Sequence, residues 1–341
     1  MKEIVVFFIL TAISFIGVEA TRTWLIQRQV IDLPNERSSH SVPTPRGGGL
    51  VIVSITLAVA LIHTLLTHNW REGLVFVVIG ALVAWIGWQD DVKSLSPKFR
   101  FLFQGLAALA TVLGLGYFKS ITIPLFGELQ LGYVGIPITI LWIMGLINAF
   151  NFMDGIDGMS GSVALTAAFG WMLFLGISGQ ASSLLFWLTI AIAASSLGFL
   201  GHNWPPARIF VGDVASTFLG FCFAVIPLMS VNRVKDAFLL GVIVMWVYIL
   251  DTLVAFLRRW IKREPVFSAH RTHIYQRLVI SGYRVASITS LYLLLTSLGV
   301  VLAYAWIHGY RFAPAAIIIG LPVLWILINL FIRYRENKAQ N

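Results

Sequence analysis

The stretch 182–200 reads Ser182-Ser-Leu-Leu-Phe-Trp-Leu-Thr-Ile-Ala-Ile-Ala-Ala-Ser-Ser-Leu-Gly-Phe-Leu200, and it contains no charged side chain. A helix of about 20 apolar residues crosses the hydrocarbon core of a bilayer, which is about 30 Å thick. Ten further stretches have the same length and character, so the sequence predicts eleven transmembrane helices. The eleven stretches are 4–21, 48–67, 73–89, 100–118, 135–153, 159–177, 182–200, 214–230, 237–257, 284–307 and 312–332.

The composition excludes a water-soluble protein. Of the 341 residues, 58% are hydrophobic and only 11% are charged, against about 25% charged in an ordinary soluble domain. The single cysteine, Cys222, allows no intrachain disulfide and no thiolate metal cluster. The net charge of +9 is typical of loops held against an anionic membrane surface rather than of nucleic-acid binding. We therefore expect an all-α, polytopic helical bundle that forms one domain over residues 1–341.

The distribution of Lys and Arg predicts the orientation. With the N-terminus outside, the 24 Lys and Arg residues divide into 18 inside and 6 outside, so the positive-inside rule predicts a cytoplasmic C-terminus. The first span resembles a signal peptide, but Val18-Glu19-Ala20 is a poor cleavage site, and we expect the span to be retained. The outer connection 121–132 alternates β-branched and apolar residues around Phe126-Gly127-Glu128, which predicts a small β-hairpin.

Acidic residues gather in three inner connections. Asp90 and Asp91 end one span, Asp154 and Asp157 follow another, and Asp213 precedes a third. Carboxylates this close together repel unless a positive group lies nearby, and their hard oxygen atoms suit Mg²⁺ or Mn²⁺. The alternative is that each aspartate caps a helix end, as Asp213 is placed to do for 214–230. Because all five lie on one membrane face, we favour a site for a metal and phosphates.

The connection Asp154-Gly155-Ile156-Asp157-Gly158 contains two glycines, which allow positive φ and a close backbone approach to a ligand. An ordinary tight connection between helices is the alternative. Asn148 and Asn151 lie one helical turn apart before it, so their amides can face one ligand.

Two inner loops are basic, at 31–49 and 258–277. Their cationic and imidazole groups suit phosphate oxygens. The alternative for each is a solvated loop that holds the inner leaflet. The candidates for phosphate contact are Arg37, His40, Arg46, His270, Arg271 and His273.

Taken together and in this order, these motifs resemble the polyprenyl-phosphate N-acetylhexosamine-1-phosphate transferases over essentially the whole chain. The phospho-MurNAc-pentapeptide translocase of the same superfamily has a late run of consecutive histidines, which this sequence lacks. The late loop is instead most similar to that of the O-antigen-initiating subgroup. The matching motifs are Pro34-Asn35-x-Arg37-x-x-His40, Pro43-Thr44-Pro45-Arg46-Gly47-Gly48, Asp90-Asp91, Asn148-Ala-x-Asn151-x-x-Asp154-Gly-x-Asp157-Gly158, Phe210-x-Gly212-Asp213-x-x-Ser216 and His270-Arg271-x-His273.

The resemblance implies a defined reaction. Such enzymes transfer a sugar-1-phosphate from a UDP-sugar to undecaprenyl phosphate and release UMP, which starts lipid-linked cell-surface glycans. It implies a bacterial inner membrane protein with its active site on the cytoplasmic face, and it makes a homodimer plausible. We therefore expect the basic residues of the loops to bind these substrates and the membrane surface, not nucleic acid.

The resemblance also assigns roles to residues. Asp213 is the expected Mg²⁺ ligand, with Asp90 and Asp91 close to the metal and the lipid phosphate, and either of that pair is a candidate base. Asn148, Asn151, Asp154 and Asp157 are expected to shape the UDP pocket. Phe210 either stacks on uracil or anchors the helix 214–230. The late loop is expected to bind the diphosphate through His270, Arg271 and His273.

Two other classes of protein fit parts of the sequence. A secondary transporter often has many spans and an intramembrane acid, and Asp251 lies inside 237–257. However, the other acids lie at helix ends, so we expect Asp251 to pair with a basic loop residue or pack in the bundle. A membrane prenyltransferase also uses acidic Mg²⁺ motifs, but its NDxxDxxxD pattern is missing here.

Overall fold

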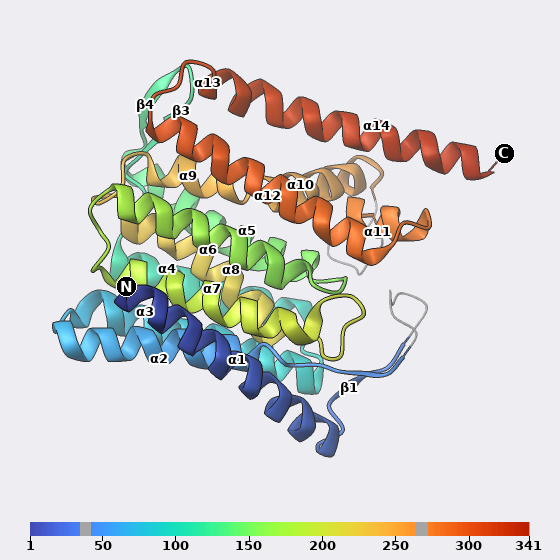
Figure 1. Cartoon of the computed structure of the whole chain (residues 1–341). Helices are drawn as coiled ribbons and strands as arrows, with labels where there is room; N and C mark the ends of the chain where they lie inside the picture. Colours follow the sequence, from blue (N-terminus) through green and yellow to red (C-terminus); the bar gives the residue numbers. More distant parts are fainter. Residues whose placement is uncertain (35–41, 264–271, 341) are drawn as a thin grey trace.

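The computed structural model describes residues 1–34, 42–263 and 272–340. It is a bundle of long helices that lie side by side (Figure 1). Within the described residues, ten helices are long and apolar enough to span a membrane, and the number is eleven when the bent pair of α9 and α10 is counted as one span. The predicted all-α, polytopic bundle of about eleven spans is confirmed. The helices are α1 (Lys2–Gln27), α2 (Leu50–Thr67), α3 (Trp70–Lys93), α4 (Pro97–Leu115), α5 (Gly135–Met153), α6 (Met159–Ile177), α7 (Leu184–Asn203), α8 (Asp213–Ser230), α9 (Ala237–Val244), α10 (Trp246–Ile261), α11 (Ile274–Ile280), α12 (Val285–Ile307), α13 (Ala313–Ala315) and α14 (Leu321–Gln340).

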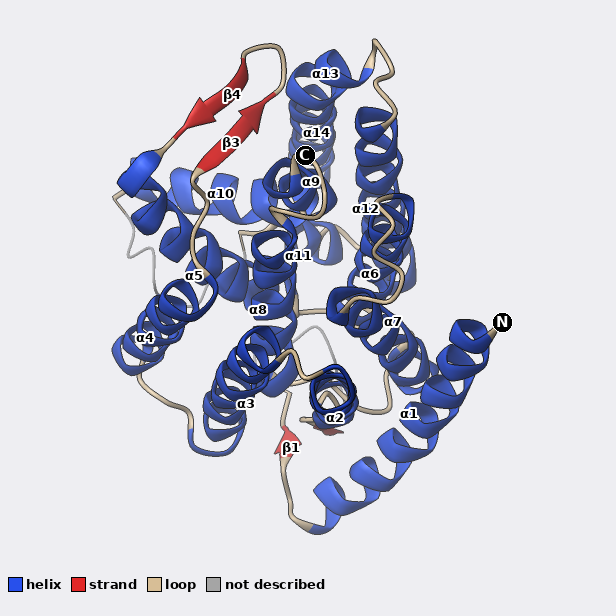
Figure 2. Ribbon diagram, turned by 90° about the vertical axis from the view of Figure 1, so that its left-hand side faces the viewer, coloured by secondary structure: helices blue, strands red, loops and turns tan. Residues whose placement is uncertain are grey.

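Helix α8 forms the centre of the bundle, with α3, α5 and α2 around it (Figure 2). In its apolar stretch 89% of the residues are buried in the protein, compared with 11% for the peripheral α1. Since lipid chains are as apolar as leucine, close helix packing rather than hydrophobicity alone favours this arrangement. The first residue of α8 is Asp213, so the most buried helix carries a site aspartate at its end.

The ninth predicted span is not one straight helix. It divides at Met245 into α9 and α10, which meet at an angle of 70°. The break contains no proline; instead the indole Nε1 of Trp246 donates to the backbone oxygen of Leu295 in α12, 2.8 Å away. Because α12 is distant in the sequence, the local apolar pattern predicted one continuous span. The bend directs α10 toward the end of the bundle that holds the site.

The two ends of the bundle differ. At one end, β3 (Ser120–Ile123) and β4 (Gly127–Gln130) pair antiparallel, with Ile121 opposite Leu129, which confirms the predicted hairpin. At the other end lie α11 and the strands β1 (Ile31–Asp32) and β2 (Thr44–Pro45), whose pairing was not predicted. Figure 1 places the two chain termini at opposite ends, as an odd number of spans requires. The remaining short elements are the 3-10 helix η1 (Gly132–Val134) and the π-helix η2 (Ala316–Gly320).

Candidate active site

The site begins where the end of α3 touches the start of α8. Gly87 makes this contact possible, because a Cβ atom there would lie 2.4 Å from the backbone oxygen of Asp213. One turn later, the carboxylate of Asp91 accepts hydrogen bonds from the backbone N–H groups of Asp213 (2.9 Å) and Val214 (3.0 Å). Asp91 therefore satisfies two of the orphan donors at the N-terminus of α8. The N-cap residue is Gly212, so the interpretation of Asp213 as the cap was wrong.

Two arginines tie the aspartates together. Arg46, from the segment before α2, contacts Asp91 Oδ1 through Nε at 2.7 Å and Asp213 Oδ1 through Nη2. Arg100, in the first turn of α4, contacts Asp90 Oδ2 at 2.6 Å and Asp213 Oδ2 at 3.6 Å, both through Nη1. These arginines are the positive groups that the crowded carboxylates require. Burial alone would lower the pKa of Arg46, but Asp213 and Asp91 raise it above its ordinary value.

Sequence reasoning placed Arg46 in the site but missed Arg100, which was counted only as an inner-face charge. Its position, ten residues after Asp90 across a short turn, was the available signal. Backbone contacts fix Arg46: it forms a parallel bridge with Phe210, and the N–H groups of Gly47 and Gly48 donate to the Phe210 oxygen at 3.1 and 2.9 Å. These contacts join the segment before α2 to the loop before α8.

The connection between α5 and α6 lies beside this cluster. Asn151 donates to the hydroxyl of Ser216 at 3.0 Å, one turn along α8 from Asp213. Asn148 instead donates to Gln104 in α4 at 2.7 Å. The expectation that both amides face one ligand is therefore not met, and only Asn151 turns toward α8.

Asp154 is buried and accepts from the hydroxyl of Ser160 at 2.8 Å. Burial raises its pKa to about 7, although the Ser160 hydrogen bond works in the opposite direction and the charge of Asp213 adds to the rise. Asp157 accepts from the backbone N–H of Ala207 at 2.9 Å, so one of its oxygens holds the loop before α8. Phe210 is half-buried in that loop, and both roles considered for it stay open.

The late loop reaches the site through His273, which is buried. Its Nδ1 lies 3.3 Å from Asp251 Oδ1 in α10, and the same oxygen accepts from the backbone N–H of Ile274 at 3.0 Å. The hydroxyl of Tyr292 donates to Asp251 Oδ2 at 2.5 Å. Asp251 thus pairs with a residue of the basic loop, as expected.

Helix α11 also packs on the glycine-containing connection. The hydroxyl of Tyr275 donates to the backbone oxygen of Phe152 at 3.0 Å. Gly155 permits this contact, because a Cβ atom there would lie 2.0 Å from that hydroxyl. The remaining candidates, Arg37, His40, His270 and Arg271, lie outside the described residues.

The carboxylates of the cluster form a small donor set for a divalent cation. Among the residues with a described placement, no three acidic, histidine or cysteine side chains form a group that could enclose a metal. Mg²⁺ usually keeps several waters and uses one or two carboxylates together with substrate phosphates. Asp90 and Asp213, whose Oδ2 atoms approach the same arginine nitrogen, supply two such carboxylates. The residues present fit the ion as a two-carboxylate site completed by substrate.

The fold and site define a multi-pass membrane protein with a charged catalytic-type cluster at one end of its bundle. Residues 73–231 match the family described as glycosyl transferase family 4. A probable undecaprenyl-phosphate N-acetylglucosaminyl 1-phosphate transferase of Bacillus subtilis is 30% identical, over 97% of this chain and 88% of that protein. The chain therefore belongs to glycosyl transferase family 4, within the polyprenyl-phosphate N-acetylhexosamine-1-phosphate transferase superfamily, as the resemblance implied.

Other relatives agree over similar lengths. A decaprenyl-phosphate N-acetylglucosaminephosphotransferase of Mycobacterium leprae is 29% identical over 91% of this chain and 81% of its own. An undecaprenyl-phosphate alpha-N-acetylglucosaminyl 1-phosphate transferase of Yersinia pestis is 27% identical over 96% of this chain and 90% of its own. Because each covers nearly the full chain, the similarity includes both ends of the bundle.

Proposed function

We propose that this protein transfers N-acetylhexosamine-1-phosphate from a UDP-sugar to undecaprenyl phosphate, at the cytoplasmic face of a bacterial inner membrane. The names of the relatives support a polyprenyl-phosphate acceptor and the transfer of an N-acetylhexosamine phosphate. The observation that carries the proposal is the cluster of Asp90, Asp91 and Asp213 with two arginines at the end of a membrane bundle. Two polyanionic substrates, one of them a lipid, meet most readily at such a place.

In the proposed reaction, an oxygen of the acceptor phosphate attacks the phosphorus that bears the sugar. The bond from that phosphorus to the bridging oxygen breaks, and UMP leaves with the bond's electron pair. A phosphate monoester has a second pKa of about 6, so the acceptor is largely a dianion at neutral pH. It needs no base, and we assign neither Asp90 nor Asp91 that role.

Charge stabilisation is the main task left to the protein. Asp90 and Asp213 would hold Mg²⁺, which when bound offsets the charge of the diphosphate and the acceptor phosphate. Arg100 and Arg46 add fixed positive charge on either side of Asp213. The notable feature of Asp91, which the resemblance places close to the metal, is that both of its oxygens already accept from the start of α8, and we therefore give it a positioning role.

Asn151, Asp154 and Asp157 line the side of the site nearest α6, and we assign the UDP moiety to that side. The late loop, with His273 described and His270 and Arg271 outside the described residues, would contact the diphosphate. Burial and the Asp251 contact hold His273 in one orientation, which is the preorganisation that transition-state stabilisation requires.

The test uses purified protein in detergent with undecaprenyl phosphate and a panel of radiolabelled UDP-sugars. We expect label in the chloroform-extractable lipid, an equal amount of released UMP, and loss of both after Asp213→Asn. A transporter would give neither product, and a prenyltransferase would give no UMP. Failure of every UDP-sugar to label lipid would refute the proposal.

A further inference from the structure

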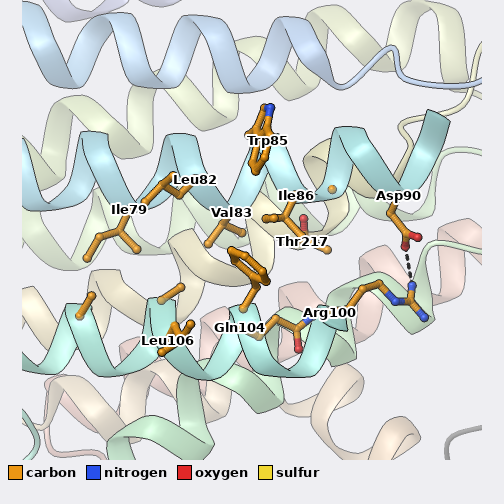
Figure 3. A pocket seen from close by; sticks show the side chains of 14 residues that line it. Ile79, Leu82, Val83, Trp85, Ile86, Asp90, Arg100, Gln104, Leu106 and Thr217 are labelled. Atoms are coloured by element: carbon orange, nitrogen blue, oxygen red, sulfur yellow. Dashed lines mark hydrogen bonds and ion pairs between the residues drawn. The ribbon is translucent and has the colours of Figure 1, made fainter. Parts of the chain in front are cut away.

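The two sides of the charged cluster are held in place differently. On one side, Asp90 of α3 and Arg100 of α4 meet directly between neighbouring helices, at the end of an apolar pocket (Figure 3). On the other side, the residues that lead into Asp213 form a loop, 204–212, which is not helical. Because such a loop pairs few of its backbone groups within itself, it needs outside contacts to keep one shape. The residues that hold this loop therefore decide where its side chains lie.

Two contacts of the loop come from elements of the site. The backbone N–H of Ala207 donates to the Asp157 carboxylate at 2.9 Å. The backbone N–H of Phe210 donates to the oxygen of Pro45 at 2.8 Å. Because Asp157 belongs to the side of the site that we assign to the UDP moiety, the loop borders that side.

A third set of contacts comes from α1, which the proposed reaction does not use. Glu19 Oε2 lies 3.2 Å from Nη2 of Arg208 in the loop and 3.3 Å from Nδ1 of His202 at the end of α7. Its Oε1 lies 2.9 Å from Nη1 of Arg22, and Nε of Arg22 donates to the backbone oxygen of Arg208 at 3.3 Å. An acidic residue in a membrane span is costly unless it pairs. Glu19 is thus paired toward the loop, and it is also the residue that makes Val18-Glu19-Ala20 a poor cleavage site.

Helix α1 is fixed closely against α7, although most of its surface faces away from the bundle. Gly198 of α7 permits the close approach, because a Cβ atom there would lie 2.5 Å from the backbone oxygen of Thr11. The buried hydroxyl of Ser14 donates to the backbone oxygen of Ser195 at 2.7 Å. Small residues and hydroxyl groups are the usual means of close helix packing in a membrane. The helix can therefore present Glu19 to the loop from a fixed position.

We infer that Glu19 is a positioning residue, which holds the loop 204–212 against α1 and thereby shapes the UDP side of the site; this rests on the proposed function. Asp213 has an anchor of its own, because its backbone N–H and that of Val214 donate to Asp91. Loss of the Glu19 charge should therefore weaken binding of the UDP-sugar and spare the Asp213 carboxylate and the lipid acceptor. The first span is then a support of the active site as well as a membrane anchor.

The test compares Glu19→Gln with Ser14→Ala. Glu19→Gln keeps the size of the side chain but removes the charge that pairs with Arg208 and His202. Ser14→Ala, five residues earlier on α1, removes a buried hydrogen bond whose recorded partner is in α7 and not in the loop. The measured quantities are kcat, KM for the UDP-sugar, KM for undecaprenyl phosphate and the melting temperature.

We expect Glu19→Gln to raise KM for the UDP-sugar about three-fold, within the range for a partly exposed ion pair, and to leave kcat and KM for the lipid unchanged. Ser14→Ala should lower the melting temperature and leave all three kinetic constants unchanged. Arg208→Gln should raise the same KM as Glu19→Gln, and the double variant should be little worse than either single variant, because both act through one contact. Additive losses, or a parallel change in all three constants, would give Glu19 a general structural role and overturn the inference.

Hydrogen exchange of the backbone amides decides the matter without a turnover assay. The N–H groups of Arg208 and Phe210 donate to the backbone oxygens of His202 and Pro45, each at 2.8 Å, so their exchange rates report the shape of the loop. Glu19→Gln should speed exchange in 204–212 about three-fold, and Ser14→Ala should not. Equal exchange in the wild type and Glu19→Gln would overturn the inference. If the wild-type protein labels no lipid, the proposed function fails, and the exchange result still tests the contact between α1 and the loop.

Discussion

Asp251→Asn tests whether an aspartate inside a membrane span positions the late loop. The wild-type carboxylate accepts from three donors: His273, the Ile274 backbone and Tyr292. It is 1% exposed, so water cannot replace a lost contact. Asparagine keeps the volume but offers one acceptor oxygen in place of two, and its NH₂ group faces a donor. At least one of the three donors must then lose its partner.

The size of the effect follows from these contacts. A hydrogen bond to a charged group contributes about 1.5–3 kcal/mol, and the 3.3 Å contact to His273 belongs at the lower end of that range. If this amount is lost from the positioning of His273, turnover falls about ten-fold, since about 1.4 kcal/mol corresponds to one factor of ten.

The assay is incorporation of radiolabelled sugar phosphate into lipid, with melting temperature recorded for each variant. Tyr292→Phe is the control: it removes one donor and leaves the carboxylate of Asp251 for His273, so turnover should stay close to wild type. In a double-mutant cycle, Asp251→Asn should add little to the loss caused by His273→Ala, because both act through one group. Fully additive losses, or a lower melting temperature at unchanged turnover, would refute the positioning role.

Four further predictions follow from the site. Asp213→Ala should lower turnover by a factor of about 1,000 or more, comparable to losing the main electrostatic stabilisation, and abolish the response to added Mg²⁺ after chelation; near-normal turnover with intact Mg²⁺ dependence would contradict the ligand assignment. Asp157→Asn combined with Phe210→Ala should weaken competition by UMP, and inhibition constants that match wild type would remove both from the UDP pocket. Gly87→Ala should lower the melting temperature and turnover together, since its Cβ would meet the Asp213 backbone oxygen at 2.4 Å; Gly145→Ala, in open space, is the control, and equal behaviour of the two would show that the α3–α8 contact tolerates expansion. His270→Ala with His273→Ala should cost about 100-fold in turnover, and a fully active double variant would leave the late loop without a catalytic role.

The parts of the structure that depend on local sequence were predictable. Apolar runs gave the eleven spans, and alternation around Gly127 gave the hairpin of β3 and β4. The order of short motifs identified the superfamily and the aspartates that meet at one end. These features depend on residues close together in the chain, so one sequence contains the necessary information.

The missed features depend on contacts between distant helices. The break at Met245 has no proline to mark it and involves a contact with α12. Arg100 was grouped with the other inner-face cations, because its contact with Asp90 forms only where α4 lies beside α3. The hydrogen bonds from the start of α8 to the Asp91 carboxylate were not predicted, because they require α3 and α8 to lie side by side. Asn148 and Asn151 share a helix, but their neighbours α4 and α8 separate their amides.

The ion pair between Arg46 and Asp213 also sets an order in time. The two residues are 167 positions apart, and ribosomes add about 5–20 residues per second, so Asp213 is made roughly 10–30 s after Arg46. Until then the Asp91 carboxylate has no α8 N-terminus to accept from, and the N–H groups of Gly47 and Gly48 lack the Phe210 backbone oxygen as their acceptor. A nascent chain halted before its eighth span can thus be anchored in the bilayer by seven helices and still be chemically inert. Catalytic competence arises late in synthesis, when the central helix inserts.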